Sequence, residues 1–353
     1  MNTARAIFPH RFLLGQLWCC LLLICAMAGL NRAVAAEPAQ SFYSGKNITL
    51  VIGTGPGGAY DIHGRLLSRH FGKHLAGAPK LIVQNMPGAG SITASNYVYA
   101  VAAQDGTVLA NILNTVPLAV ALGQVQTQFD PSKFQWIGNM VREVYVVMVW
   151  HTAPAKSIED AKSANVLLGA TSPAALSGIY PPVFNDLLGT KFQRIAGYKE
   201  AVAIDLAVER GEVHGRAGET WYGRTGTMWE WVRDGKGKII LQIGFNKADE
   251  LQDVPLFLDL VKNDPEKRQL AELFSSPALF GKPTVVSPNV PADRVSLLRR
   301  AYADTMKDPE FLADAKKLGI NIEPVSGDEL SKLAKSFGEI SPTLLDQAKR
   351  MAN

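Results

Sequence analysis

Residues 53–58 combine glycine spacing with a nearby acidic residue, a pattern that is suited to binding an anion. They read Gly-Thr-Gly-Pro-Gly-Gly, follow the apolar run 48–52 and precede a helical pattern that begins near residue 60. Glycines let the backbone turn sharply, and the following helix presents unpaired N–H groups and the positive end of its dipole. Phosphate and carboxylate are both stabilised there, although a glycine turn without a ligand is the alternative. The candidate ligand-binding residues of this loop are Gly55, Pro56, Gly57, Gly58 and Asp61.

The same loop matches the G-x-G-x-x-G fingerprint of dinucleotide-binding folds. That fingerprint needs an acidic residue at the end of the next strand, where it binds the ribose. Here the next strand-like run ends Val83-Gln84-Asn85. We therefore expect an anion other than a dinucleotide, and no cofactor.

The elements that position this loop alternate between strand-like and helix-like segments. Repeated β-α order with short glycine-rich connections predicts a layered α/β arrangement with parallel strands. The expected strands are 48–52, 81–84, 107–113, 141–150, 166–169, 192–195, 212–216 and 278–286. The expected helices are 60–71, 91–103, 157–163, 171–188, 199–210, 291–307, 309–318 and 328–351.

The order of these elements indicates two α/β lobes, with the second inserted into the first. Two strands must then cross between the lobes, and 141–150 and 278–286 are the candidates. The expected organisation is a signal peptide over 1–36, lobe 1 over 37–142 and 278–353, and lobe 2 over 143–277.

The first 36 residues have the three parts of a secretory signal peptide. Arg5 and Arg11 precede the apolar run 17–30, and a small-residue site follows at 33–36. This arrangement predicts export with cleavage, and the apolar run is short for a transmembrane span. An uncleaved anchor and a lipoprotein site at Cys25 are the alternatives.

Cysteine content and charge limit the chemistry of the exported chain. Its three cysteines, Cys19, Cys20 and Cys25, all lie in the signal segment, so the remaining chain has no disulfide and no thiolate nucleophile. Removing residues 1–36 leaves 33 basic against 32 acidic residues. A nearly neutral chain argues against nucleic acid or an anionic membrane as the partner.

A series of short motifs follows in order along almost all of the chain after the signal segment. The motifs are 55–58 with Asp61, 85–90 (Asn-Met-Pro-Gly-Ala-Gly), 105–109 (Asp-Gly-Thr-Val-Leu), 198–200 (Tyr-Lys-Glu), 205–206, 211–213 (Gly-Glu-Val), 253–255 (Asp-Val-Pro), 288–291 (Pro-Asn-Val-Pro), 308–309 and 318–319. No single motif is decisive, but the ordered series resembles the solute receptors of tripartite tricarboxylate transporters, the Bug family.

The resemblance implies a periplasmic binding protein-like fold, with two α/β lobes and a hinged cleft between them. It also implies a monomeric receptor without catalysis, metal or cofactor, which captures a small organic carboxylate and delivers it to a membrane permease. In such receptors the Pro-Gly-Gly loop faces a loop of the other lobe, which here would be Thr171, Ser172 and Pro173. The alternatives are a simple helix cap at Thr171 and Ser172, and a periplasmic enzyme that acts on a carboxylate in the same cleft.

The segment 214–222 departs from the family pattern and lies where cleft residues are expected. Arg216 could pair with a second ligand carboxylate, and Trp221 or Tyr222 could stack on the ligand. Glu219 lies in the same stretch and completes the candidate set. A surface strand position for Arg216 and a core position for Trp221 are the alternatives.

Other groups of residues suggest weaker hypotheses. His70 and His74 have the i, i+4 spacing of a metal pair, but Gly72 lies between them and no nearby acidic residue completes a site, so a solvated helix end is expected. Trp229 and Trp231 could form a sugar-binding platform, although packing is favoured. No G-x-S-x-G motif is present, so the sequence shows no standard acyl-transfer nucleophile.

Overall fold

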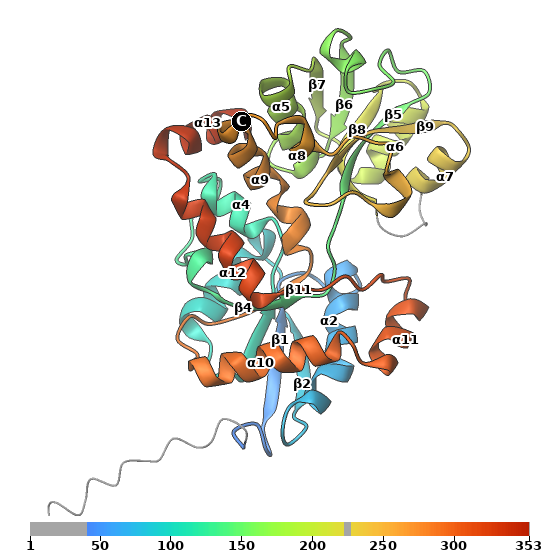
Figure 1. Ribbon diagram of the computed structural model, residues 1–353. Helices are drawn as coiled ribbons and strands as arrows, with labels where there is room; N and C mark the ends of the chain where they lie inside the picture. Colours follow the sequence, from blue (N-terminus) through green and yellow to red (C-terminus); the bar gives the residue numbers. More distant parts are fainter. Residues whose placement is uncertain (1–40, 222–226, 353) are drawn as a thin grey trace, which may run out of the picture.

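The computed structural model describes residues 41–221 and 227–352, which form two lobes, each built on its own β-sheet (Figure 1). The expected signal peptide over 1–36 and the candidate Tyr222 lie outside the described residues. Within the described part of the chain, no helix is both long and apolar enough to cross a membrane.

Lobe 1 contains a six-stranded sheet with the order β11-β4-β10-β3-β1-β2. Its strands β1, β2 and β3 pair in parallel, as the alternating strand and helix pattern predicts. Strand β10 instead runs antiparallel to both of its neighbours. The strands of this sheet are β1 (Asn47–Ile52), β2 (Lys80–Asn85), β3 (Val108–Asn111), β4 (Gln135–Asn139), β10 (Pro283–Val286) and β11 (Val325–Ser326).

Lobe 2 contains a five-stranded sheet with the order β7-β6-β8-β5-β9. Strand β5 has the sequence YVVMVW, and all six residues are buried. Alternate residues of β5 enter different hydrophobic clusters, which shows that both faces of the sheet are covered. The strands of this sheet are β5 (Tyr145–Trp150), β6 (Val166–Ala170), β7 (Phe192–Ala196), β8 (Gly215–Thr220) and β9 (Gly237–Ile243).

Helices cover both sheets, and several begin at side-chain caps that are visible in the sequence. Asp264 and Asp308 each accept a hydrogen bond from a backbone N–H of the following turn and each precede a proline at the first helical position. The helices are α2 (Ala59–His70), α3 (Ile92–Asn96), α4 (Val116–Ala121), α5 (Leu176–Leu188), α6 (Ala201–Glu209), α7 (Thr227–Arg233), α8 (Phe257–Leu260), α9 (Pro265–Phe280), α10 (Ala292–Thr305), α11 (Pro309–Lys317), α12 (Gly327–Ser336) and α13 (Pro342–Ala352).

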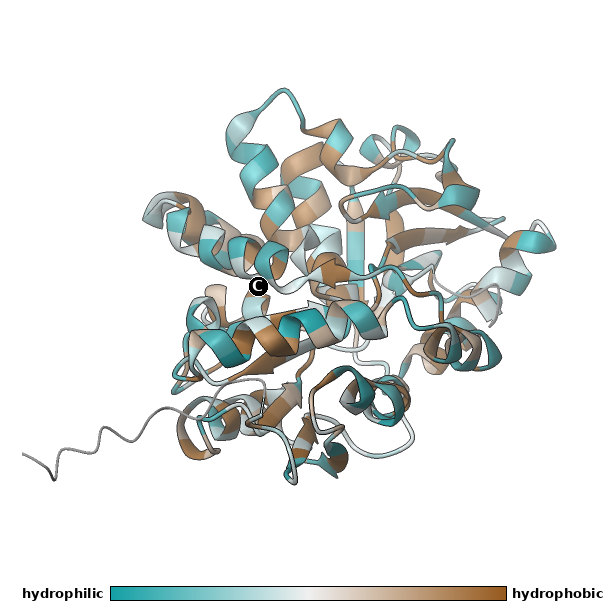
Figure 2. Cartoon of the chain, turned by 60° about the horizontal axis from the view of Figure 1, so that its bottom comes forward, coloured by the Kyte–Doolittle hydropathy of each residue, from teal (hydrophilic) through white to brown (hydrophobic). Residues whose placement is uncertain are grey.

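Apolar side chains are concentrated between the sheets and their helices. In Figure 2 the strands inside the lobes are largely brown, whereas the outer helices carry much teal. Phe71, Tyr302 and Phe311 are buried on one face of the lobe 1 sheet, and Trp136 and Phe280 are buried on the other. Each sheet is therefore the centre of a three-layered lobe.

The chain leaves lobe 1 between β4 and β5 and returns from α9 to β10. The predicted strand over 278–286 is therefore wrong in its first part, because α9 continues to Phe280. Pro277 has no N–H to donate to the carbonyl of Leu273, but the hydroxyl of Ser276 donates to that carbonyl at 2.6 Å. This replacement lets the helix continue through the proline.

The C-terminal region also differs from the expectation. The predicted helix over 328–351 is two helices, α12 and α13, and α13 begins at Pro342. Leu344, Ala348 and Met351 of α13 join the core of lobe 2, where α13 packs against α5. The expected division placed 278–353 in lobe 1, whereas the last helix lies on lobe 2.

The two crossing segments are tightly joined at Gly281. Its backbone has φ 52° and ψ −107°, and a side chain there would overlap the carbonyl oxygen of Val141 and the amide of Asn139. The Asn139 amide donates to the carbonyl of Leu279 at 3.0 Å and accepts from the N–H groups of Val141 (3.1 Å) and Lys282 (2.7 Å). The outgoing and returning chains therefore form one hydrogen-bonded unit.

Gly281→Ala should destabilise the protein because it combines a positive φ with steric overlap. We expect a loss of about 2–4 kcal/mol in the free energy of unfolding, measured by denaturant titration. Gly319→Ala is the matched control, since Gly319 has φ 70° and open space around its Cα. The control should lose only about 1 kcal/mol, and equal losses for both variants would contradict the proposed tight contact.

Candidate functional site

The carboxyl ends of several strands face the gap between the lobes. In lobe 1, β10 begins just after the crossing, and its Thr284 pairs with Asn111 at the end of β3. Strand β1 is parallel to β3, so the loop after Ile52 lies on this same edge. In lobe 2, Tyr145 at the start of β5 pairs with Thr220 at the end of β8. Since β6 is parallel to β8, the segment after Ala170 faces lobe 1.

The first candidate loop is held in shape by Asp61. The Asp61 carboxylate accepts hydrogen bonds of 2.9 Å from the N–H of Gly57, the guanidinium of Arg65 and the amide of Asn85. The hydrogen bond from Arg65, with those from Gly57 and Asn85, holds the pKa of this carboxyl at about 2, although burial opposes the shift. Asp61 therefore fixes the conformation of the loop by hydrogen bonds to Gly57 and Asn85.

This arrangement changes which N–H groups the loop offers to an anion. The sequence led us to expect the N–H of Gly57 to face a ligand, but it is bound to Asp61. Helix α2 begins after Gly58, and no side-chain hydrogen bond caps its first turn. Pro56, Gly57 and Gly58 are exposed and Gly55 is half-buried. Gly58 and the start of α2 are therefore the accessible end of the loop.

The second candidate loop is a turn that precedes α5. The expected helix start near residue 171 is displaced, because α5 begins at Leu176. The hydroxyl of Ser172 accepts from the N–H of Ala175 at 3.2 Å, which stabilises the turn before α5, and the helix itself has no side-chain cap. The N–H of Thr171 donates to Ser177 at 3.3 Å, and its own side chain is half-buried. Ser172 and Pro173 are exposed at the facing edge of lobe 2.

Arg216 is engaged in ion pairs within lobe 2. Its guanidinium lies 3.0 Å from the carboxylate of Asp205 and 3.4 Å from that of Glu219. Arg216 is buried, and burial raises the pKa of the Asp205 carboxyl while Arg216 opposes that rise. Sequence analysis offered two hypotheses for Arg216, a partner for a second ligand carboxylate and a surface strand position. The structure instead places it in a strand but buried, where two protein carboxylates neutralise it.

The tryptophans near this segment are mainly packing residues. Trp221 is buried and makes an edge-to-face contact with Trp229, with ring centroids 5.5 Å apart. Trp231 makes a similar contact with Trp150 at 4.9 Å, and its indole N–H donates to Glu209 at 3.1 Å. These contacts correspond to the packing alternative, although Trp221 also borders a cavity.

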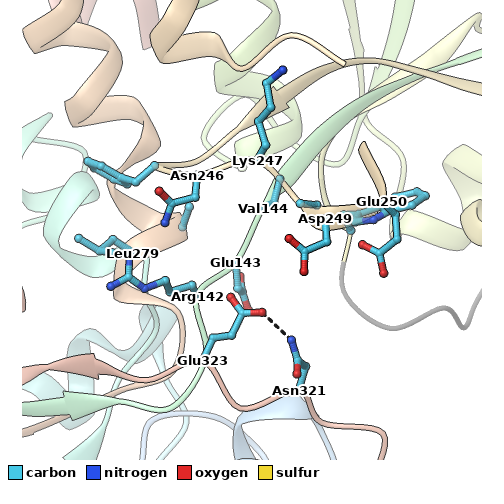
Figure 3. A pocket seen from close by; sticks show the side chains of 14 residues that line it. Arg142, Glu143, Val144, Asn246, Lys247, Asp249, Glu250, Leu279, Asn321 and Glu323 are labelled. Carbon is cyan, nitrogen blue, oxygen red and sulfur yellow. Dashed lines mark hydrogen bonds between the residues drawn. The ribbon is translucent and has the colours of Figure 1, made fainter. Parts of the chain in front are cut away.

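This cavity has a volume of about 350 Å³ and lies between the lobes beside the outgoing crossing segment (Figure 3). Figure 3 shows the carboxylates of Glu143, Asp249, Glu250 and Glu323 around it. Of the sequence-predicted site residues, Trp221 lines it, whereas the two candidate loops do not. The lining residues are Arg142, Glu143, Val144, Trp221, Phe245, Asn246, Lys247, Ala248, Asp249, Glu250, Ala278, Leu279, Asn321 and Glu323.

Sequence analysis did not predict the polar residues of the crossing segments. Glu143 directly precedes the apolar run 144–150, and Lys282 directly precedes the apolar strand β10. A single charge at the start of a buried strand was the available signal, but the partner of each charge lies about 140 residues away in the sequence.

The histidines with metal-like spacing have acidic neighbours, contrary to the expectation. His70 lies 3.1 Å from Asp314 and His74 lies 2.9 Å from Asp308, both contributed by the region of α11. Oxygen and nitrogen atoms of His70, Asp308 and Glu310 also lie within 4.8 Å of one another. However, the ammonium of Lys73 lies 2.7 Å from Asp308 and 2.8 Å from Glu310, so a protein cation already bridges these carboxylates.

Comparison with known proteins gives matches among solved structures. No family model matches the sequence, and no curated protein sequence matches it either. A ligand-free TctC solute-binding protein from Polaromonas is 18% identical, with a TM-score of 0.67 over 88% of this chain and 98% of that chain. The chain has the fold of a solute-binding protein.

Two further structural matches carry a ligand. MatC from Rhodopseudomonas palustris with bound malate is 18% identical, with a TM-score of 0.54 over 87% of this chain and 99% of that chain. A second R. palustris protein, with adipate, is 15% identical, with a TM-score of 0.57 over 87% and 97% of the two chains. These matches confirm the expected fold class, and at this identity they show the fold alone.

Asp61→Asn should lower stability in a pH-dependent way. Because the folded pKa of about 2 lies below the ordinary value of 3.8, the stabilisation is present above pH 4 and is lost as the pH falls towards 2. We expect a loss of about 1.5 kcal/mol at pH 7 that shrinks by pH 2.5. Chemical denaturation across this range measures it, with exposed Asp346→Asn as the control. A pH-independent difference would contradict the assigned hydrogen bonds.

Arg216→Ala should destabilise the protein, because it leaves Asp205 buried without its cation. We expect a loss of about 3 kcal/mol in the free energy of unfolding. The double variant with Asp205→Asn should recover part of that loss, which a double-mutant cycle by denaturation would measure. Full additivity of the two single changes would show that the pair is not coupled in the folded protein.

Proposed function

We propose that this protein is a periplasmic receptor that binds a small organic carboxylate between its lobes and delivers it to a tripartite tricarboxylate-type permease. The observation that carries the proposal is the position of two loops. The loop after β1 and the loop after β6 each lie at the carboxyl ends of strands, on the edges by which the two lobes face each other. Ligands of open α/β sheets bind at the carboxyl ends of the strands, and ligand pockets are common between lobes.

The structural relatives support this choice of ligand class. The matched proteins include one with bound malate and one with adipate, both small carboxylates. The Polaromonas match is described as a TctC solute-binding protein. We extend that role to this chain because its exposed Gly58 and the uncapped α2 form a site of the kind that a carboxylate occupies.

The proposed grip relies on neutral donors. The first N–H groups of α2 would hold one carboxylate, and the hydroxyl of Thr171 would reach it from lobe 2 when the lobes close around the ligand. Such a site stabilises an anion without a buried cation, so no desolvated charge remains when the ligand leaves. Since Arg216 is paired with Asp205 and Glu219, we propose no role for it in binding a second carboxylate.

Export and partners complete the proposal. We propose that residues 1–36 direct the chain to the periplasm and are cleaved after Ala36, which leaves a monomeric receptor. The partner would be a membrane permease that accepts the ligand from the closed receptor. We propose no catalytic step, since the arrangement of N–H groups and hydroxyls serves binding.

A thermal-shift screen of aliphatic and aromatic mono- and dicarboxylates tests the proposed function. A ligand at a hundred times its Kd stabilises the folded state by about 2.7 kcal/mol, which raises the melting temperature measurably. Mass spectrometry after long incubation should recover the ligand unchanged. Conversion of the ligand would favour an enzyme, and no stabilisation by any carboxylate would contradict the proposal.

Gly58→Val should abolish binding of the carboxylate found in this screen while leaving the fold intact. Gly58 has extended backbone (φ −82°, ψ 174°) and open space around its Cα, so valine is tolerated but covers the start of α2. Gly338→Val is the matched control, because Gly338 is also exposed and unhindered. Calorimetry on both variants decides the matter, and wild-type affinity of Gly58→Val would exclude this loop as the anion site.

A further inference from the structure

A network of buried polar side chains lies where the two crossing segments meet. The carboxylate of Glu143 forms an ion pair with Lys282, accepts from the hydroxyl of Tyr145 at 2.7 Å and lies 3.4 Å from the amide of Asn114. Glu143, Lys282 and Asn114 are all buried. Buried charges are tolerated only with such partners, so the network fixes where these side chains lie.

Tyr60 connects this network to the candidate anion site. Its hydroxyl donates to the carbonyl of Gly281 at 2.9 Å and accepts from the N–H of Asn114 at 2.9 Å. The ammonium of Lys282 lies 4.8 Å from the centre of its ring. Tyr60 is the second residue of α2, two positions after Gly58. One side chain therefore joins the start of α2 to the returning crossing segment.

The orientation of the Gly281 carbonyl depends on the angle between the lobes. The backbone of Gly281 has the φ and ψ values that only glycine adopts readily, and it packs directly against Val141 of the outgoing segment. Rotation of lobe 2 relative to lobe 1 must change backbone angles in these two segments. Such a rotation would reorient the carbonyl that Tyr60 holds.

We propose that Tyr60 is a positioning residue that couples the start of α2 to the angle between the lobes. Its hydroxyl holds the carbonyl of Gly281 in the orientation of this structure, and an anion at the start of α2 acts on the same helical turn. The inference rests on the proposed function for its ligand, although the effect on the free protein stands independently. The side chain of Tyr60 makes no contact with the ligand in this proposal.

Tyr60→Phe tests the coupling because it removes the hydroxyl and keeps the ring. Tyr43→Phe is the matched control, since the buried Tyr43 hydroxyl also donates to a glycine carbonyl, that of Gly106 in lobe 1. The exported chain has no cysteine, so Lys80→Cys and Lys191→Cys, both at exposed positions, can carry spin labels on the two lobes. Pulsed electron resonance then measures the distribution of distances between the lobes, and thermal melting confirms that each variant is folded.

We expect the ligand-free distance distribution of Tyr60→Phe to broaden or shift relative to the wild type, and that of Tyr43→Phe to remain unchanged. The affinity for the carboxylate identified by the thermal-shift screen should weaken about tenfold in Tyr60→Phe alone. A wild-type distance distribution for Tyr60→Phe would overturn the coupling, even if the protein binds a carboxylate. If no carboxylate binds the wild type, the proposed function fails, and the ligand-free distances still decide whether Tyr60 sets the lobe angle.

Discussion

The close contact between the two crossing segments is the constraint on which the rest of the structure depends. Gly281 packs against the carbonyl of Val141, and the amide of Asn139 bonds to both chains. Together with the segment between α12 and α13, which takes the chain to lobe 2 again, this connection leaves each lobe with its own sheet and restricts the relative motion of the lobes to these segments. The buried ion pair of Glu143 and Lys282 then makes the position of this connection specific, since either charge alone would be costly.

From this connection follows the placement of the candidate site. Strands β10 and β5 start at the crossing segments, and each runs antiparallel to a neighbour, β3 or β8, whose carboxyl end therefore lies at the crossing. Since β1 is parallel to β3 and β6 is parallel to β8, the loops after β1 and β6 lie on facing edges of the two lobes. Within the first loop, Asp61 uses its carboxylate to fix the glycine turn and leaves the start of α2 without a side-chain cap. The Asp61 carboxylate thus fixes the loop without capping the start of α2, where we propose that an anion binds.

The fold class could be predicted because its pattern is local and repeated. Apolar runs such as 48–52 and 144–150, separated by glycine turns and capped helices, indicate α/β units without knowledge of distant contacts. The predicted element boundaries were wrong where contacts with residues distant in sequence outweigh the local pattern. Residues 278–280 have a strand-like sequence, but the hydroxyl of Ser276 replaces the helical hydrogen bond that Pro277 cannot donate, so α9 continues. Helix α13 lies on lobe 2 because its apolar side chains pack against α5.

The sequence by itself determined the glycine turn before a helix and the two α/β units, since these follow from local spacing, whereas the position of residues 171–173 opposite that turn was expected only from the family resemblance. Only the tertiary structure decided which polar groups are free to bind. Arg216 is neutralised by Asp205, the N–H of Gly57 is taken by Asp61, and Tyr60 reaches Gly281 across 221 residues of sequence. A charge or an N–H group has one nearest partner in space, and that partner is chosen by packing rather than by local sequence.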